Sequence, residues 1–184
     1  MSDRTSRMGR WSAVGHLLGL ALLVLAVHRG AVGVFGAATV RGDPLLNAWI
    51  LSWDQHAPCR LGTPLWHGNI LYPFPFALAY SENLLAPAVL LLPLRAVTDH
   101  PLVLYHAALL AGAWGSAVCA WLLGRRLTGS ALLAWLPAVT ITACPLVQAH
   151  WSHLQMVQVY GMPLLLWAAW RYREALAEPR WTSW

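Results

Sequence analysis

The sequence GDPLLNAWILSWDQH, residues 42–56, predicts a helix that lies along a membrane surface. Asp43 is a favourable N-cap residue, and Pro44 suits the first position of a helix. An apolar stripe follows at helical spacing, formed by Leu46, Trp49, Ile50 and Trp53. Tryptophan rings favour the membrane–water boundary, where the ring is half buried, so this stripe predicts an interfacial helix.

The polar residues of this stretch fall on another face of the same helix. They are Asp43, Asn47 and Asp54, and we expect the two carboxylates to face outward from the membrane. Acidic side chains are costly to hold close to lipid. The presence of carboxylates at the membrane surface therefore indicates that the protein acts on a substrate that is itself anchored in lipid.

The composition indicates an integral membrane protein. The chain has 184 residues, of which 58% are hydrophobic and only 10% are charged, and its mean hydropathy is +0.52. A soluble domain has about a quarter of its residues charged. The sequence therefore predicts an all-α integral membrane protein that forms a single membrane domain over residues 1–184.

The positive charge does not indicate nucleic acid as a partner. Lysine is absent and the formal net charge is +5, so arginine supplies every fixed positive charge. These arginines lie at the ends of apolar segments and form no basic stripe along a helix. Such a distribution is typical of topology signals under the positive-inside rule.

Cysteine usage carries little information about the compartment. Of the three cysteines, two lie in apolar segments and one lies in a polar loop. No CxxC pair is present, so the sequence indicates neither a disulfide framework nor a thiolate metal site.

Hydropathy predicts about four transmembrane helices, at about residues 11–27, 102–124, 130–147 and 156–170. Arginines precede the first span, lie between the second and third, and follow the fourth. The positive-inside rule then places both termini in the cytoplasm and leaves one long outer loop at about residues 28–100. We expect a multi-pass protein of the cell's inner (plasma) membrane.

Two segments allow alternatives to this topology. A cleaved signal peptide is the alternative for the first span, but His28 and Arg29 stand where a small-residue cleavage site is expected. Residues 82–97 contain an apolar run too short to span comfortably, interrupted by Pro87 and Pro93. We interpret this run as an interfacial or re-entrant helix, because a further span would place Arg126 outside.

Small residues recur every fourth position on the second predicted span, at Ala108, Gly112, Ser116 and Ala120. Such a face permits close approach of another helix. The sequence therefore predicts a helix–helix partner, bound through Gly112, Ser116 and Ala120.

Carboxylates concentrate in the outer loop and are the first candidates for chemistry. Asp43 and Asp54 are about 16 Å apart on a straight helix, too far to share a metal ion or a proton. Helix capping alone explains Asp43 fully. Glu82 has two open interpretations: it favours the positive end of a helix that Ser81 caps, or it contacts a substrate or a metal ion.

A second group of candidates closes the third predicted span. His150 and His153 share a helix face, so both can reach one ligand. With a carboxylate they could bind a divalent ion, and the alternative is a pair of interfacial histidines. Donation to a phosphate is a better interpretation than metal ligation or proton transfer.

An aromatic, proline-interrupted loop covers residues 66–76. It suits a lid over an apolar substrate, and equally a loop anchored among lipid headgroups. The sequence contains no phosphate-binding glycine loop, no HExxH and no Ser/His/Asp arrangement.

Several short motifs together resemble a known family. They are Gly42-Asp43 with the Trp49/Trp53 helix, Asn69-Ile70-Leu71-Tyr72-Pro73, Ser81-Glu82-Asn83-Leu84-Leu85, Gly124-Arg125-Arg126-Leu127-Thr128-Gly129 and His150 through Gln155. Their order resembles the N-terminal part of bacterial GT-C-type membrane glycosyltransferases that use polyprenyl-phosphate sugars, such as protein O-mannosyltransferases and aminoarabinose transferases. The resemblance covers about residues 40–173.

The resemblance implies glycosyl transfer from a lipid-linked sugar donor at the outer membrane face. It implies that Asp43 is the catalytic residue, as a general base or a metal contact. We expect Arg41, Glu82, His150, His153 and Gln155 to bind the substrate. A second acidic residue is usual in the next outer loop of such enzymes, whereas this chain has His150, His153 and Gln155 there. We therefore predict no cofactor and no metal site, with a divalent cation as the alternative.

Such enzymes have many more spans, so the resemblance implies an incomplete N-terminal portion that is inactive on its own. Membrane lipids are the other expected partners. The alternative function is non-catalytic: a small helical membrane protein, or a truncated relic that packs against a partner.

Overall fold

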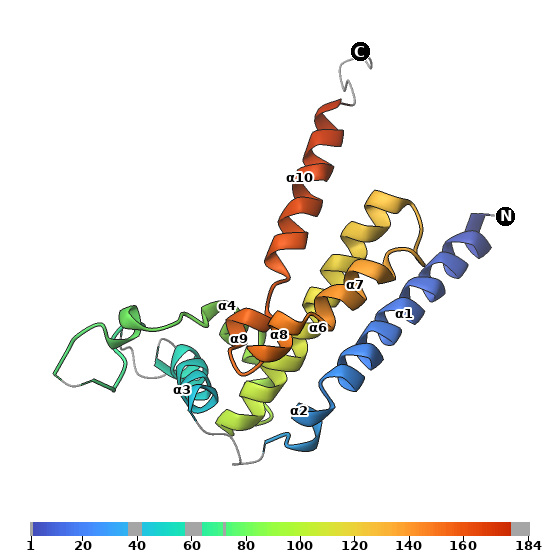
Figure 1. The fold of residues 1–184 in the computed structure, drawn as a ribbon. Helices are drawn as coiled ribbons and strands as arrows, with labels where there is room; N and C mark the ends of the chain where they lie inside the picture. The colour runs from blue at the N-terminus through green and yellow to red at the C-terminus, as the bar shows by residue number, and fades with distance from the viewer. Residues whose placement is uncertain (1, 37–41, 58–63, 72, 178–184) are drawn as a thin grey trace. The chain divides into compact units, whose positions relative to one another are not determined.

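The computed structural model describes residues 2–36, 42–57, 64–71 and 73–177 (Figure 1). It is 73% helical, and the described residues contain no strand. The prediction of an all-α protein is therefore confirmed.

Among the described residues, four helices have 14 residues or more and the others have eight or fewer. In chain order they are α1 (Ser2–Val27), α2 (Arg29–Gly33), α3 (Asp43–His56), the 3₁₀ helix η2 (Ala77–Tyr80), α4 (Leu85–Leu90), α5 (Leu92–Arg95), α6 (Pro101–Thr128), α7 (Trp135–Thr142), α8 (Pro145–Ala149), α9 (Leu154–Val157) and α10 (Gly161–Ala177). Proline at position 145 separates α7 from α8, because the residue before a proline is disfavoured in a helix.

Helix α6 contains the predicted span at 102–124 and is, within the described residues, the one helix long and apolar enough to cross a membrane. Residues 12–27 and 135–149 form shorter apolar helices. Helices α4 and α5 have six and four residues. At 1.5 Å per residue each is about 9 Å long or less, far below a bilayer core of about 30 Å. The other three spans stay predictions.

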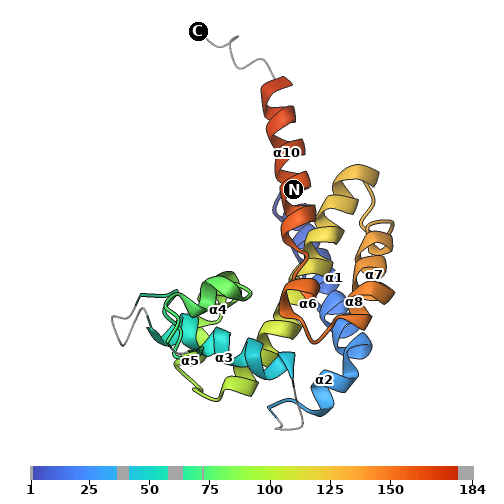
Figure 2. The same ribbon diagram turned by 60° about the vertical axis from the view of Figure 1, so that its left-hand side comes forward.

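The chain divides into two compact units, which we describe separately. Unit 1 comprises Met1–Val27, Ala113–Gln148 and Gln158–Trp184, and unit 2 comprises His28–Gly112 and Ala149–Val157. In unit 1, α1 packs beside α7 in both views (Figures 1 and 2). A Cβ atom at Gly19 would lie 2.8 Å from the ring of Trp135, whose Nε1 donates to His16 Nδ1 at 3.0 Å.

Charged residues of unit 1 meet near the ends of two helices. Arg126, in the last turn of α6, forms an ion pair with Glu174 of α10. Trp170 Nε1 also donates to Glu174 Oε1, at 2.8 Å. Two of the arginine-rich segments assigned to the cytoplasm are thus in direct contact through this carboxylate.

The small-residue face of α6 is covered by the chain itself. Gly112, Ser116 and Ala120 are all buried. These residues are therefore closely packed within this chain, and the helix–helix partner stays a prediction.

In unit 2, the buried face of α3 is partly polar. Asn47, Asp54 and Gln55 are buried together with Ile50 and Leu51. The expectation that both carboxylates of α3 face outward is wrong for Asp54, whose exposed fraction is 5%. The reason is that each inward polar side chain has a backbone partner: Gln55 Nε2, for example, donates to the carbonyl of Ala88 at 2.8 Å.

The two tryptophans of α3 are half-buried and hold a neighbouring loop. Trp49 Nε1 donates to Asn69 Oδ1 at 3.2 Å, and Trp53 Nε1 donates to the carbonyl of Leu65 at 3.0 Å. Their rings stack with centroids 5.9 Å apart. The polar ends of both indoles are therefore paired with residues 65–69 of the same unit.

The N-terminus of α3 differs from the prediction. Gly42 occupies the N-cap position with φ of +71°, a conformation that favours glycine, and Asp43 is the first helical residue. No side chain caps this helix. The prediction that Asp43 is the N-cap is therefore wrong, since Gly42 turns the chain and leaves the Asp43 carboxylate available to other groups.

Candidate functional site

Three candidate residues from distant parts of the sequence meet in unit 2. His153 Nε2 lies 3.4 Å from Asp43 Oδ2, and His153 Nδ1 lies 3.9 Å from Glu82 Oε1. Asp43 begins α3, Glu82 precedes α4, and His153 precedes α9. One imidazole therefore stands within ion-pair distance of two carboxylates.

The loop that carries His153 is held by its backbone. The carbonyl of Ser152 accepts a hydrogen bond from Tyr105 Oη at 2.9 Å and another from Asn47 Nδ2 at 3.3 Å. Trp151 stacks on the buried His28, with ring centroids 5.8 Å apart and planes inclined by 16°. Contacts at Trp151 and Ser152 thus fix the position from which His153 reaches Asp43.

The segment that carries Glu82 is held in place by a contact with α3. The backbone N–H of Leu84 donates to the buried Asp54 carboxylate, and burial raises the pKa of Asp54 to about 6. Asn83 Oδ1 accepts from the backbone N–H of Leu85 at 2.9 Å. Ser81 was a candidate cap for this helix, but Leu84 occupies the N-cap position and Asn83 supplies the side-chain acceptor.

The three side chains differ in exposure, and all are accessible. The exposed fractions are 62% for Asp43, 37% for Glu82 and 29% for His153. A carboxylate that is exposed, held at the start of a helix and not used as a cap can accept a proton from a bound hydroxyl group. A histidine beside it can orient the carboxylate and, when protonated, carry positive charge towards an anion.

The remaining candidates lie around this cluster or outside the described chain. The exposed His150 has its ring centroid 6.2 Å from that of His153. Gln155 is exposed on α9, and Arg41 lies outside the described residues. Among the described residues, no group of three or more His, Cys, Asp and Glu side chains is arranged to hold a metal ion.

Sequence reasoning missed the residues that support the cluster. Asn47 was assigned to a polar face only, and Tyr105 was treated as part of an apolar span. A buried tyrosine hydroxyl normally requires a hydrogen-bond partner, which was the available signal at Tyr105. Ser152 acts through its carbonyl oxygen, for which the sequence gives no signal.

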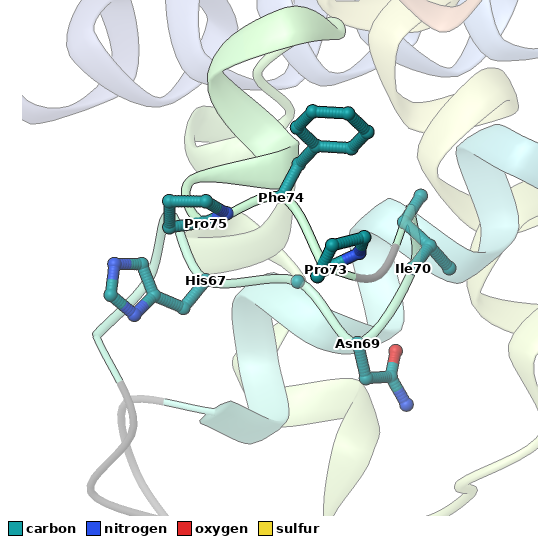
Figure 3. A pocket seen from close by; sticks show the side chains of 7 residues that line it. His67, Asn69, Ile70, Pro73, Phe74 and Pro75 are labelled. Atoms are coloured by element: carbon teal, nitrogen blue, oxygen red, sulfur yellow. The ribbon is translucent and has the colours of Figure 1, made fainter.

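The aromatic loop of residues 64–71 and 73–76 forms a cavity of about 330 Å³. Figure 3 shows its wall, which includes His67, Asn69, Ile70, Pro73 and Phe74. The His67 ring packs edge-on against Phe76, with centroids 4.4 Å apart. Asn69 of this wall is also the acceptor for Trp49, so the cavity is tied to α3.

Comparison with known proteins finds no matching family model, no similar curated protein and no similar solved structure. The chemistry of the site is therefore the basis for assigning a function. The feature with most chemical content is the contact of His153 with Asp43 and Glu82.

Proposed function

We propose that this chain belongs to a membrane glycosyltransferase of the GT-C type, which transfers a sugar from a lipid-phosphate donor to an acceptor hydroxyl at the outer membrane face. The observation that carries the proposal is the meeting of Asp43, Glu82 and His153 from three separate segments. Its two carboxylates and one imidazole suit proton removal from a hydroxyl group.

In the proposed reaction, Asp43 takes the proton of the acceptor hydroxyl group. The acceptor oxygen forms a bond to the anomeric carbon of the sugar, and the bond from that carbon to the phosphate oxygen breaks. The electron pair of the broken bond leaves with the lipid phosphate. His153 orients Asp43, while Arg41 and His150 are the candidates to stabilise charge on the departing phosphate.

Features of unit 1 support the membrane topology in this proposal. Helix α6 is long and apolar enough to span, and Arg125 and Arg126 lie in its last turn. The ion pair between Arg126 and Glu174 suits a topology in which α6 and α10 end on the same side of the membrane. Four spans with both termini in the cytoplasm would place the Asp43 cluster on the outer side.

The test is a transfer assay on the protein that carries this sequence, purified as its gene encodes it and placed in lipid nanodiscs. It receives a radiolabelled polyprenyl-phosphate sugar and candidate acceptors. Asp43→Asn should lower turnover by about a hundredfold or more, the usual effect of losing a general base. Binding of the donor, measured by equilibrium dialysis in nanodiscs, should change little.

The matched control is Glu174→Gln, which removes a carboxylate of unit 1 that pairs with Arg126. Its turnover should equal that of the unmodified protein. Undiminished turnover of the Asp43→Asn protein would contradict the assignment of Asp43 as the base. Absence of both donor binding and transfer in the unmodified protein would contradict the proposed function.

A further inference from the structure

A groove in unit 2 lies apart from the residues assigned to sugar transfer. It has a volume of about 520 Å³ and runs between α3 and the connection from α5 to α6. Asp43, Glu82 and His153 are not among its lining residues. Its walls carry an arginine, a carboxylate, a histidine and a serine hydroxyl together with apolar side chains, which is a combination suited to an amphiphilic ligand.

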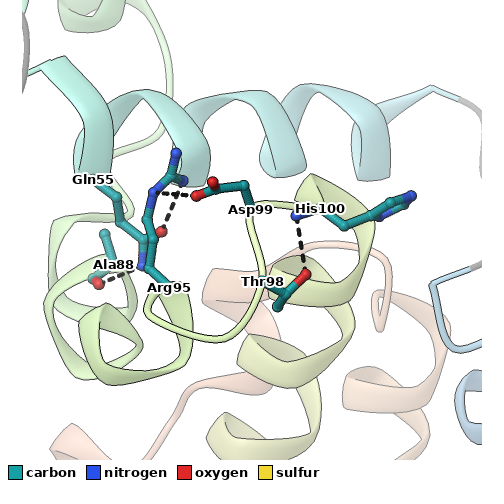
Figure 4. Close-up of polar contacts among 6 residues, drawn as sticks. All are labelled: Gln55, Ala88, Arg95, Thr98, Asp99 and His100. Atoms are coloured by element: carbon teal, nitrogen blue, oxygen red, sulfur yellow. Dashed lines mark hydrogen bonds and ion pairs between the residues drawn. The ribbon is translucent and has the colours of Figure 1, made fainter.

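The arginine of this groove is held in place from the core. Arg95 Nη1 donates to Gln55 Oε1 at 3.4 Å, and Gln55 is itself fixed by its bond to the Ala88 carbonyl (Figure 4). The Arg95 side chain is 14% exposed. Its guanidinium group is therefore oriented before any ligand binds, which lowers the entropic cost of binding.

Arg95 and Asp99 form a loose pair at the mouth of the groove. Asp99 Oδ1 lies 3.3 Å from Arg95 Nε, yet this buried nitrogen makes no hydrogen bond with the described residues. The Asp99 side chain is 64% exposed. The Asp99 carboxylate of this pair is exposed and Arg95 Nε makes no hydrogen bond to it, so a ligand can replace this contact at little cost.

The other lining residues include a serine hydroxyl group and several apolar side chains. The hydroxyl oxygen of Ser52 is buried and has no hydrogen-bond partner among the described residues. Leu45, Trp49 and Leu102 contribute apolar walls. A buried hydroxyl group without a partner is costly, and a ligand oxygen beside Ser52 would remove that cost.

We propose that this groove binds a phospholipid whose headgroup carries both a phosphate and a primary ammonium, as phosphatidylethanolamine does. The phosphate contacts Arg95 and Ser52, the ammonium contacts Asp99, and the apolar part lies along Leu45, Trp49 and Leu102. Charge complementarity selects this headgroup: a purely anionic lipid is repelled by Asp99, and a trimethylated ammonium has no N–H to donate.

This inference rests on the membrane location in the proposed function, and it is independent of sugar transfer. The test is lipid binding to the purified chain in detergent, followed by native mass spectrometry. The probes are phosphatidylethanolamine, phosphatidylglycerol and phosphatidylcholine with identical acyl chains. We expect phosphatidylethanolamine to bind about tenfold more tightly than the other two, the effect of one charge-assisted hydrogen bond.

Two variants separate the roles of the charged groups. Asp99→Asn should abolish the preference among the three lipids, and Arg95→Ala should weaken binding of all three by about tenfold. Arg171→Ala removes an exposed arginine of α10 and should change neither quantity. Circular dichroism checks that each variant folds. Asp99→Asn alters an exposed side chain, so this variant tests the inference even where Arg95→Ala fails to fold.

Soluble competitors distinguish a headgroup site from a general anion site. Phosphoethanolamine should displace the lipid, whereas inorganic phosphate at the same concentration should not. Equal affinity for the three lipids, retention of the preference in Asp99→Asn, or equal displacement by inorganic phosphate would overturn the inference. None of these results depends on transfer activity, so each is distinguishable from failure of the glycosyltransferase proposal.

Discussion

Asp43 and His153 are distant in sequence, yet their side chains lie 3.4 Å apart in unit 2. The contact is possible because Gly42 takes the N-cap position of α3 and the Asp43 carboxylate caps nothing. Two interpretations of Asp43, a helix cap and a functional carboxylate, can therefore be separated by their effects on stability.

We expect Asp43→Ala to lower the free energy of unfolding by at most about 0.5 kcal/mol, the size of an exposed charge interacting with a helix dipole. Loss of a true N-cap side chain costs about 0.5–2 kcal/mol, typically about 1. Reversible unfolding in mixed detergent micelles, followed by circular dichroism, measures the difference. A loss well above 1 kcal/mol would show that the side chain does stabilise the helix end.

Tyr105→Phe tests whether the Ser152 carbonyl positions His153. The variant removes one of the two donors to this oxygen and keeps the ring, so we expect a loss of about 1 kcal/mol in stability. In the transfer assay of the gene-encoded protein, turnover should fall while donor binding is retained. Tyr172→Phe, on the exposed part of α10, is the control and should change neither quantity.

The sequence predicted the positions of the helices α3 and α6 more accurately than it predicted which face of α3 is buried. Periodicity predicted a helix at 42–56 and hydropathy predicted a span at 102–124. Helices α3 and α6 contain these segments apart from Gly42, the N-cap of α3. The prediction that Asp54 faces outward was wrong, because the polar side chains of α3 find backbone partners in the interior. Asn47, Asp54 and Gln55 are therefore buried together with Ile50 and Leu51 of the same helix.

In the candidate site, the sequence predicted the functional side chains but not the backbone groups that hold them. Asp43, Glu82 and His153 were chosen from residue type and local spacing, and the structure brings these three together. Their supports could not be chosen in this way, because the Ser152 carbonyl and the Leu84 N–H are backbone groups that every sequence contains. Side-chain chemistry is visible in a sequence, whereas the backbone groups that orient it depend on the fold.

Gly124→Ala should destabilise unit 1. A Cβ atom at this position would lie 2.7 Å from Pro137 Cγ and 3.1 Å from Ala134 Cα, so α6 and α7 would have to separate. Overpacking of this kind costs about 1–3 kcal/mol. Gly161→Ala is the matched control because its Cβ would meet no atom within 4 Å. Equal thermal midpoints for the two variants would contradict the close packing at Gly124.

The last prediction concerns Asp54, whose pKa burial raises to about 6 from an ordinary value of 3.8. Between these pH values the folded protein retains the proton and the unfolded chain releases it. Stability therefore falls as pH rises from about 4 to about 6, and it stays lower above that range. A shift of about two pKa units corresponds to about 3 kcal/mol, which is an upper limit on the effect.

Asp54→Asn should remove this slope, because the amide stays neutral and its oxygen can still accept the Leu84 N–H. At pH 7.5 we expect the variant to be more stable than the unmodified protein by about 1 kcal/mol or more, because burial disfavours the charged carboxylate of Asp54 and the amide carries no charge. Thermal unfolding in detergent from pH 4 to pH 8 measures both curves. The control is Asp99→Asn, which changes an exposed carboxylate and should leave the dependence of stability on pH unchanged. If the stability of Asp54→Asn and that of the unmodified protein depended on pH in the same way, Asp54 would ionise without cost to folding.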